Sequence, residues 1–147
     1  FVRLTQCATD DICQAESGPQ IDMEIRDLPR RLDKVYEEIH HRSPDAKVLA
    51  TGYLPLIKHG ETCPYIEKIP ASDREWLAES IERINQAVRE ASERHGATYV
   101  LADAALDHTA CSPSPWVDFT GKETDSFPMH PTHAGQQAMA QALRAAL

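Results

Sequence analysis

Residues 47–53, Lys-Val-Leu-Ala-Thr-Gly-Tyr, decide the fold class of this sequence. The run is short and apolar, and it lies between the breaker Ser43-Pro44 and a proline-containing loop, which is typical of a buried strand. Residues 97–102, Ala-Thr-Tyr-Val-Leu-Ala, have the same character. The sequence therefore predicts two short buried strands.

Helical periodicity precedes the first strand. A breaker at Ser17-Gly18-Pro19 is expected to come before this helix, and Pro29 predicts either a kink or two abutting helices. Apolar residues recur there at alternating steps of four and three, which indicates one buried helical face. They are Ile21, Ile25, Leu28, Leu32, Val35 and Ile39.

Two further helices are predicted after the first strand. Ser72-Asp73-Arg74-Glu75 has the pattern of a capping box, which would open the helix between the strands, and Gly96 is a natural stop for it. A last helix is expected over residues 132–147, with Pro131 at its first turn. The buried stripe of the middle helix is expected to be Leu77, Ile81, Ile84, Val88 and Ala91.

This order of elements predicts an α/β fold. Helices that alternate with strands imply parallel strands joined by right-handed crossovers. Two parallel strands do not make an independent sheet, so about half of such a domain is expected to lie outside this chain. The alternative is that residues 1–18 or 103–129 contain further strands.

Composition excludes several classes of function. A net charge of -8 at pH 7 argues against nucleic-acid binding, which needs a basic face. No apolar run approaches the roughly 20 residues that a membrane-spanning helix needs. The chain starts at Phe1 rather than Met, and we expect a mature, processed or truncated product whose targeting segment is already removed.

The four cysteines indicate disulfides. Cys7 and Cys13 bracket a short polar loop, whereas Cys63 and Cys111 lie in loops far apart in the sequence. Three pairings are possible, and Cys7–Cys13 with Cys63–Cys111 closes the loops most simply. No pair has the close spacing of a zinc site, so neither a metal nor a cofactor is expected. Disulfides imply an oxidising compartment, and we expect a secreted or extracytoplasmic protein.

His130 is the candidate general base. It lies where an irregular loop meets the last predicted helix, a position at which α/β enzymes place functional groups. The nearby helix N-terminus disfavours the imidazolium and so helps to keep the ring able to accept a proton. A lone histidine in such a place is more often a surface or capping residue, so this setting alone does not decide its role.

Four motifs resemble the SGNH (GDSL-type) hydrolases, in matching order. Residues 130–140, His-Pro-Thr-His-Ala-Gly-Gln-Gln-Ala-Met-Ala, are similar to the last conserved block of that family, in which the catalytic histidine precedes a proline and the final helix. Residues 44–53 resemble the P-x-A-x-V…G-Y strand of its disulfide-rich actinobacterial secreted branch. Residues 108–117 resemble the H-x-x-C…W-V loop of that branch, and the Cys7–Cys13 loop resembles the one that follows the family's G-N-D segment.

The resemblance implies a three-layer α/β/α, flavodoxin-like domain and serine esterase or lipase activity, but the nucleophile block is missing. The G-D-S motif, the oxyanion glycine and the G-N-D asparagine are absent. We therefore expect residues 1–147 to be the C-terminal portion of one hydrolase domain, inactive when isolated. An N-terminal half, separate or missing, would supply the serine. The serines that this chain does have are interpreted as loop, cap or surface residues: Ser17, Ser43, Ser72, Ser112, Ser114 and Ser126.

The partner of His130 also departs from the family pattern D-x-x-H, because Phe127 stands three residues before it. Some members of the branch use a main-chain carbonyl there, and we favour the Phe127 carbonyl over the side chain of Asp125. Trp116 and Phe119, with Phe127, are candidates for an acyl pocket. His108 is interpreted as a structural hydrogen-bonding residue, and His59 has no ligand partner at useful spacing.

Two functions remain open. The first is hydrolysis of a carboxylic ester, possibly in a lipid or an acylated glycan, with His130 as base. The alternative is a non-catalytic fragment derived from the same fold, with a binding or structural role. The missing serine favours the alternative, and intact His130-Pro131 and an intact last helix do not exclude it, because both also have structural roles.

Overall fold

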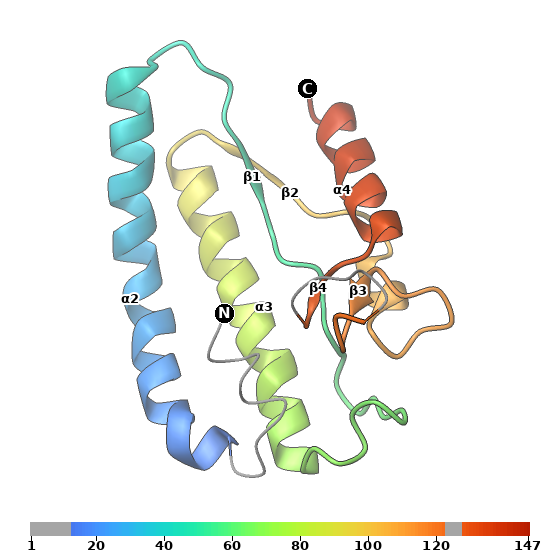
Figure 1. Cartoon of the computed structure of the whole chain (residues 1–147). Coiled ribbons are helices and arrows are strands. Elements are labelled where there is room, and N and C mark those ends of the chain that lie inside the picture. The colour runs from blue at the N-terminus through green and yellow to red at the C-terminus, as the bar shows by residue number, and fades with distance from the viewer. Residues whose placement is uncertain (1–12, 123–127) are drawn as a thin grey trace.

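The computed structural model describes residues 13–122 and 128–147 and has three layers (Figure 1). Strands β1 (Leu49–Thr51) and β2 (Thr98–Val100) lie side by side and parallel, with Leu49 opposite Thr98. Helices α2 (Cys13–Arg42) and α3 (Ala71–Arg94) pack together on one side of the strands, and α4 (His133–Ala145) covers the other. The predicted α/β class and both predicted strands are confirmed.

Helix α2 runs unbroken through Pro19 and Pro29, so the predicted breaker at Ser17-Gly18-Pro19 is wrong. Proline removes one backbone donor, but burial on the α3 side offsets that loss: Cys13 and Ile21 are both buried. The first turn also gains an acceptor from elsewhere, because the buried Asp73 carboxylate accepts the Cys13 amide at 3.0 Å. This tertiary bond satisfies a donor that a helix start leaves unpaired.

The buried face of α2 follows the predicted stripe except at Val35, since Leu32 and Ile39 also pack against the interior. Ile21 and Ile25 are buried as expected, but Val35 is 53% exposed, and Tyr36 takes its place in the interior at 5% exposure. The Tyr36 ring stacks on His95 beyond the end of α3, with centroids 5.4 Å apart. Steps of three and four are both compatible with a helix, so the sequence alone does not distinguish Val35 from Tyr36.

Helix α3 starts at Ala71 without a side-chain cap, so the predicted capping box at residues 72–75 is wrong. The two acids of that predicted box have partners in other segments: Asp73 bonds Cys13, and Glu75 bonds His59 and Gly60. The predicted buried stripe is confirmed at Leu77, Ile81 and Ala91. Gly96 adopts a φ of 69° just after the helix, as a C-terminal stop requires.

The segment predicted to be irregular contains short elements that the sequence does not reveal. A 3₁₀ helix, η1 (Ala105–His108), is followed by β3 (Val117–Asp118), which pairs antiparallel with β4 (His130–Pro131). Pro131 therefore lies in a strand rather than in the first turn of the last helix. Helix α4 begins at His133, and the Thr132 hydroxyl caps it by accepting the Gly135 amide at 3.2 Å.

The predicted Cys63–Cys111 disulfide is confirmed, with Cα atoms 5.7 Å apart. It joins the loop after β1 to the loop after β2. Cys13 is also disulfide-bonded, whereas its predicted partner Cys7 lies outside the described residues. In the part of the chain that the structure describes, no helix is long and apolar enough to cross a membrane.

Candidate active site

His130 is held at the surface by the small β3–β4 sheet. It opens β4, is exposed, and lies opposite Asp118 of β3. Its Nδ1 lies 3.1 Å from the main-chain carbonyl oxygen of Pro128. Because a carbonyl only accepts, this contact favours the tautomer with its proton on Nδ1 and its lone pair on Nε2.

The segment after His130 is locked to residues 115–118. The Thr132 amide donates to the Trp116 carbonyl at 2.9 Å, and the Thr132 hydroxyl donates to the Pro115 carbonyl at 3.0 Å. Gly135 is buried against the same segment, where a Cβ would overlap the Trp116 carbonyl oxygen. The start of α4, and with it the end of β4, is therefore fixed by its contacts with Pro115 and Trp116.

The predicted partners of His130 stay predictions. Phe127 and Asp125 both lie outside the described residues. The contact that the structure describes is with the next residue, Pro128, and it is of the predicted kind, a main-chain carbonyl on Nδ1. A carbonyl can fix the tautomer, but it stabilises an imidazolium less than a carboxylate does.

The two candidate pocket aromatics are half-buried and pack against the core. The Trp116 ring stacks on His108, with centroids 4.1 Å apart and planes within 6°. A pocket of about 550 Å³ adjoins Pro131 and the first turn of α4, and its lining includes Ser114, His133 and Gln136 but neither Trp116 nor Phe119. Their role in binding an acyl group therefore stays a prediction.

His108 has the surroundings of a structural residue. Its Nδ1 lies 2.8 Å from the Ser114 carbonyl oxygen and 3.1 Å from the Ser114 hydroxyl. An Nδ1–H that donates to the carbonyl has no lone pair with which to deprotonate the neighbouring serine. This histidine–serine contact thus fixes the loop before Trp116 and is not arranged as a base with its nucleophile.

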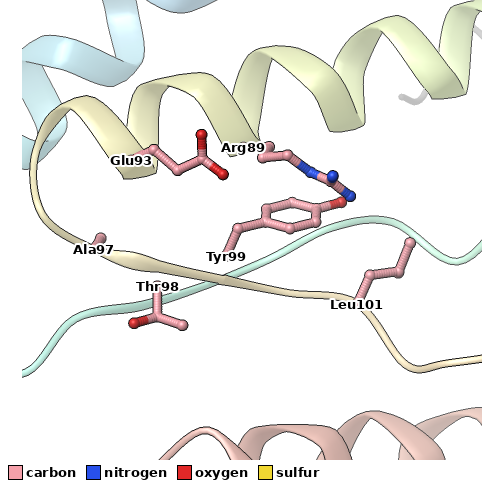
Figure 2. A pocket seen from close by; sticks show the side chains of 6 residues that line it. All are labelled: Arg89, Glu93, Ala97, Thr98, Tyr99 and Leu101. Atoms are coloured by element: carbon pink, nitrogen blue, oxygen red, sulfur yellow. The ribbon is translucent and has the colours of Figure 1, made fainter.

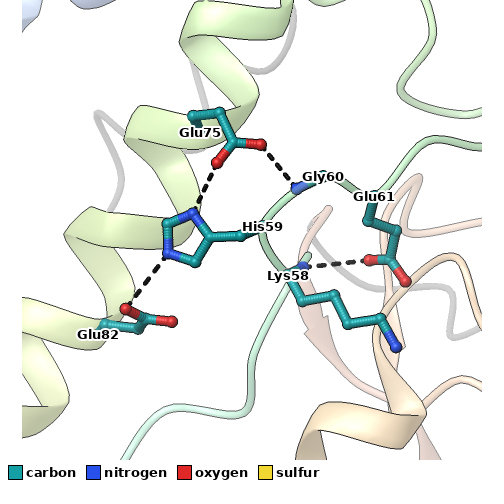
Figure 3. A network of polar contacts seen from close by, with 6 residues as sticks. All are labelled: Lys58, His59, Gly60, Glu61, Glu75 and Glu82. Atoms are coloured by element: carbon teal, nitrogen blue, oxygen red, sulfur yellow. Dashed lines mark hydrogen bonds and ion pairs between the residues drawn. The ribbon is translucent and has the colours of Figure 1, made fainter.

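Sequence reasoning missed the ionic network around His59 (Figure 3). Its Nδ1 lies 2.6 Å from a Glu75 carboxylate oxygen, and its Nε2 lies 3.4 Å from Glu82. Both acids are on α3, and their hydrogen bonds raise the pKa of His59. The Gly60 amide and His59 together lower the pKa of Glu75. The network ties the Cys63 loop to α3; no cluster of metal-ligating side chains occurs among the described residues.

A second pocket, of about 400 Å³, lies between α3 and β2 (Figure 2). Its lining includes Arg89 and Tyr99, and the Arg89 guanidinium lies 4.7 Å from the centre of the Tyr99 ring, a cation–π distance. Partial burial raises the pKa of Tyr99. The two pockets share no lining residue, so this one is separate from the α4 pocket beside Pro131.

Two solved structures share the fold. An extracellular lipase from Streptomyces rimosus aligns with 99% of this chain and 63% of its own, with a TM-score of 0.81 and 24% identity. Phospholipase A1 from Streptomyces albidoflavus NA297 aligns with 98% of this chain and 62% of its own, with a TM-score of 0.76 and 24% identity. These likenesses place the three layers in the SGNH lipase fold.

Sequence comparison agrees. Lipase 2 of Streptomyces coelicolor is 30% identical over an alignment of 153 positions that covers 94% of this chain and 52% of that protein. Lipase 1 of the same organism is 30% identical over 110 residues, 74% of this chain and 40% of that protein. The chain thus spans about half the length of these curated relatives. Residues 4–138 match the GDSL-like Lipase/Acylhydrolase family, and the chain therefore belongs to that family.

Proposed function

We propose that the protein hydrolyses carboxylic esters by serine chemistry and that this chain supplies the general base, His130. The observation that carries the proposal is the 3.1 Å contact of Nδ1 with the Pro128 carbonyl. It favours the tautomer in which Nε2 accepts a proton, and it does so on an exposed residue at the start of a paired strand. Family membership supports ester hydrolysis as the reaction class.

In this mechanism Nε2 takes the hydroxyl proton as the serine oxygen attacks the ester carbonyl. The tetrahedral intermediate collapses when the imidazolium returns that proton to the leaving alkoxide, and an alcohol departs. Water then loses a proton to Nε2 and attacks the acyl-enzyme, which releases the carboxylic acid and restores the serine. The Pro128 carbonyl accepts the Nδ1 proton's hydrogen bond in both the neutral ring and the imidazolium, so only Nε2 exchanges a proton.

The serine and the oxyanion donors would come from an N-terminal piece, with residues 1–147 as the C-terminal portion of one domain. Three features support this division. The chain covers 63% of the Streptomyces rimosus lipase structure, and it lacks a G-D-S segment. Within the described residues, β1 and β2 make a parallel sheet of only two strands, which is too small to be stable alone.

The substrate is proposed to be a lipid or a simple carboxylic ester, with an acylated glycan as the other candidate. The relatives named above are lipases and a phospholipase A1, which favours an acyl ester of a lipid. A secreted protein is proposed on the confirmed disulfide and on the likeness to an extracellular lipase.

The first test is turnover of a p-nitrophenyl ester by the protein with its serine-bearing piece, whose presence intact-mass measurement would establish. Changing His130 to Ala should lower kcat by about a thousandfold or more, as removal of a catalytic base does in serine hydrolases. Changing His41 to Ala, the control at an exposed histidine in the last turn of α2, should leave kcat within a fewfold. A kcat that is equal in both variants would refute His130 as base.

Two further arms separate the remaining choices. Changing Asp125 to Asn should have little effect if a main-chain carbonyl orients His130, and a large loss of kcat would assign that role to the acid. If intact mass shows this chain alone and ester turnover is nil, the non-catalytic alternative replaces the enzyme proposal for the isolated chain.

A further inference from the structure

Met129, the residue before His130, has an unusual backbone conformation. Its φ is 65°, in the left-handed region that side chains other than those of glycine, asparagine and aspartate rarely occupy. In the part of the chain that the structure describes, it shares a positive φ with only one other non-glycine residue, Ala104. A conformation of this kind persists only where the surrounding structure holds it in place.

Hydrogen bonds show that Met129 forms a bulge in the small sheet. The Met129 amide donates to the Asp118 carbonyl at 2.6 Å, while His130 is the residue paired with Asp118 in the ladder. Met129, just before β4, and His130, its first residue, thus both face Asp118 of β3. This is the pattern of a G1-type β-bulge, in which the first residue is left-handed and is usually glycine. Such bulges turn the side chain that follows them.

The side chain of Met129 anchors this bulge. It is 3% exposed and belongs to the main apolar core, whereas the residues beside it, Pro128 and His130, are exposed. Glycine at this position would meet the backbone requirement without strain, but it would have nothing to bury. The methionine therefore links the core to a loop whose neighbouring residues lie at the surface.

The residue that receives the bulge is fixed as well. Asp118 is 4% exposed, and its carboxylate accepts the amides of Thr120 and Gly121 at 3.0 and 2.9 Å. This turn holds the end of β3, so the Asp118 carbonyl offers a stationary acceptor to Met129. The direction of the His130 ring then depends on how firmly the buried Met129 side chain fixes the backbone before β4.

We propose that Met129 is a positioning residue for His130. Its buried side chain holds the left-handed bulge, which aims the imidazole and keeps the Pro128 carbonyl opposite Nδ1. The inference rests on the proposed role of His130 as general base, and it adds the residue through which core packing determines the tautomer and direction of that base.

The test compares Met129→Gly with Met129→Leu in the protein that contains its serine-bearing piece. Glycine keeps the left-handed backbone and removes the anchor, so kcat for a p-nitrophenyl ester should fall roughly ten- to a hundredfold with KM unchanged. Leucine keeps the buried volume and should retain kcat within about threefold. If Met129→Gly does not fold at the assay temperature by circular dichroism, Met129→Ala takes its place under the same criteria.

A second readout reports on the imidazole itself. Nitrogen-15 spectra of histidine-labelled protein, with the His130 signals assigned by their loss in His130→Ala, should show the proton on Nδ1 in the parent and a mixture of tautomers in Met129→Gly. Ile25→Ala, a core change in α2, should leave both the tautomer and kcat unchanged, which separates positioning from general loss of stability.

Parental kcat and tautomer in Met129→Gly would overturn the inference, as would an equal loss of kcat in Ile25→Ala. The proposed function fails by a different result, namely parental activity in His130→Ala. An inactive His130→Ala together with a fully active Met129→Gly would leave the proposed function standing and remove only the role of Met129.

Discussion

At the scale of single residues, the approach of α4 to the rest of the molecule depends on Gly135 having no side chain. A Cβ there would overlap the Trp116 carbonyl oxygen and would lie 3.0 Å from Leu54 Cδ1. A backbone atom cannot move aside as the end of a long side chain can. The two segments that hold His130 therefore meet at a point with no room for one more carbon atom.

Changing Gly135 to Ala should destabilise the fold by about 1–3 kcal/mol, because the added methyl forces α4 away from its backbone neighbour. Thermal unfolding followed by circular dichroism measures the effect. Gly18→Ala is the matched control: its Cβ would meet Gln14 Cγ at an ordinary 3.6 Å within a helix. That change should stabilise by about 0.5–1 kcal/mol. If both variants melt alike, the close contact at Gly135 is not real.

Single residues also show where sequence reasoning was sufficient and where it was not. His130 could be selected because its spacing to Pro131 and Gly135 matches a family block. The sequence does not predict the Pro128 contact or the left-handed conformation of Met129, because methionine gives no local signal for a positive φ. That conformation is imposed by a partner strand and by the core, neither of which is visible in a local pattern.

At the scale of elements, the start of α2 depends on a carboxylate from α3. The Asp73 carboxylate accepts the Cys13 amide across 60 positions of sequence, and both residues are buried. The sequence pattern alone predicts that the same residue belongs to a local capping box. A cap of this kind depends on which helices pack together. Periodicity therefore predicted both helices, but the local motif gave Asp73 a partner in its own helix instead of Cys13 of α2.

Asp73→Ala should therefore lower the free energy of unfolding by about 1.5–3 kcal/mol, because it leaves a buried amide without its charged acceptor. Asp73→Asn, which keeps an acceptor oxygen, should lose less. Urea unfolding gives the values, and Glu79→Ala on the exposed side of α3 should stay within about 0.5 kcal/mol of the parent. A loss in Glu79→Ala as large as that in Asp73→Ala would contradict this assignment.

The His59 network predicts how stability changes with pH (Figure 3). Glu75 and Glu82 raise the pKa of His59 above 6.5, so its contribution is fully present below that pH and is lost as the pH rises through the raised pKa. Glu75 has a pKa lowered from 4.5, so its contribution is lost as the pH falls through the lowered value. The network is therefore strongest between these two transitions.

His59→Gln should lower Tm by a small amount near pH 6 and leave it unchanged near pH 9, where the parent imidazole is neutral. The effect is small because His59 and Glu75 are each about half exposed, with side chains 51% and 48% accessible, and added salt should weaken it. Glu61 of the same loop accepts hydrogen bonds from the Lys58 amide and the Thr109 hydroxyl. The His59 variant therefore removes no contact of Glu61. A Tm difference between parent and variant that is constant from pH 6 to 9 would show that the His59 ion pair does not stabilise the fold.

At the scale of the whole molecule, the described residues include His130 and the β3–β4 pair that holds it, but only two parallel strands, β1 and β2. The order of helices and strands was enough to predict the α/β class and the two parallel strands. It was not enough to reveal the β3–β4 pair, because strands of two residues are too short to show an alternating pattern. The sheet that aims His130 was thus the least predictable part of the fold.

The central claim is that the base lies on this chain and the nucleophile lies outside it. The most direct measurement is labelling of the assembled protein with a fluorophosphonate ester, followed by identification of the labelled peptide by mass spectrometry. The label should be on a serine outside residues 1–147, and His130→Ala should slow labelling by about a hundredfold or more. Label on a serine within residues 1–147, or an unchanged rate in His130→Ala, would contradict the account.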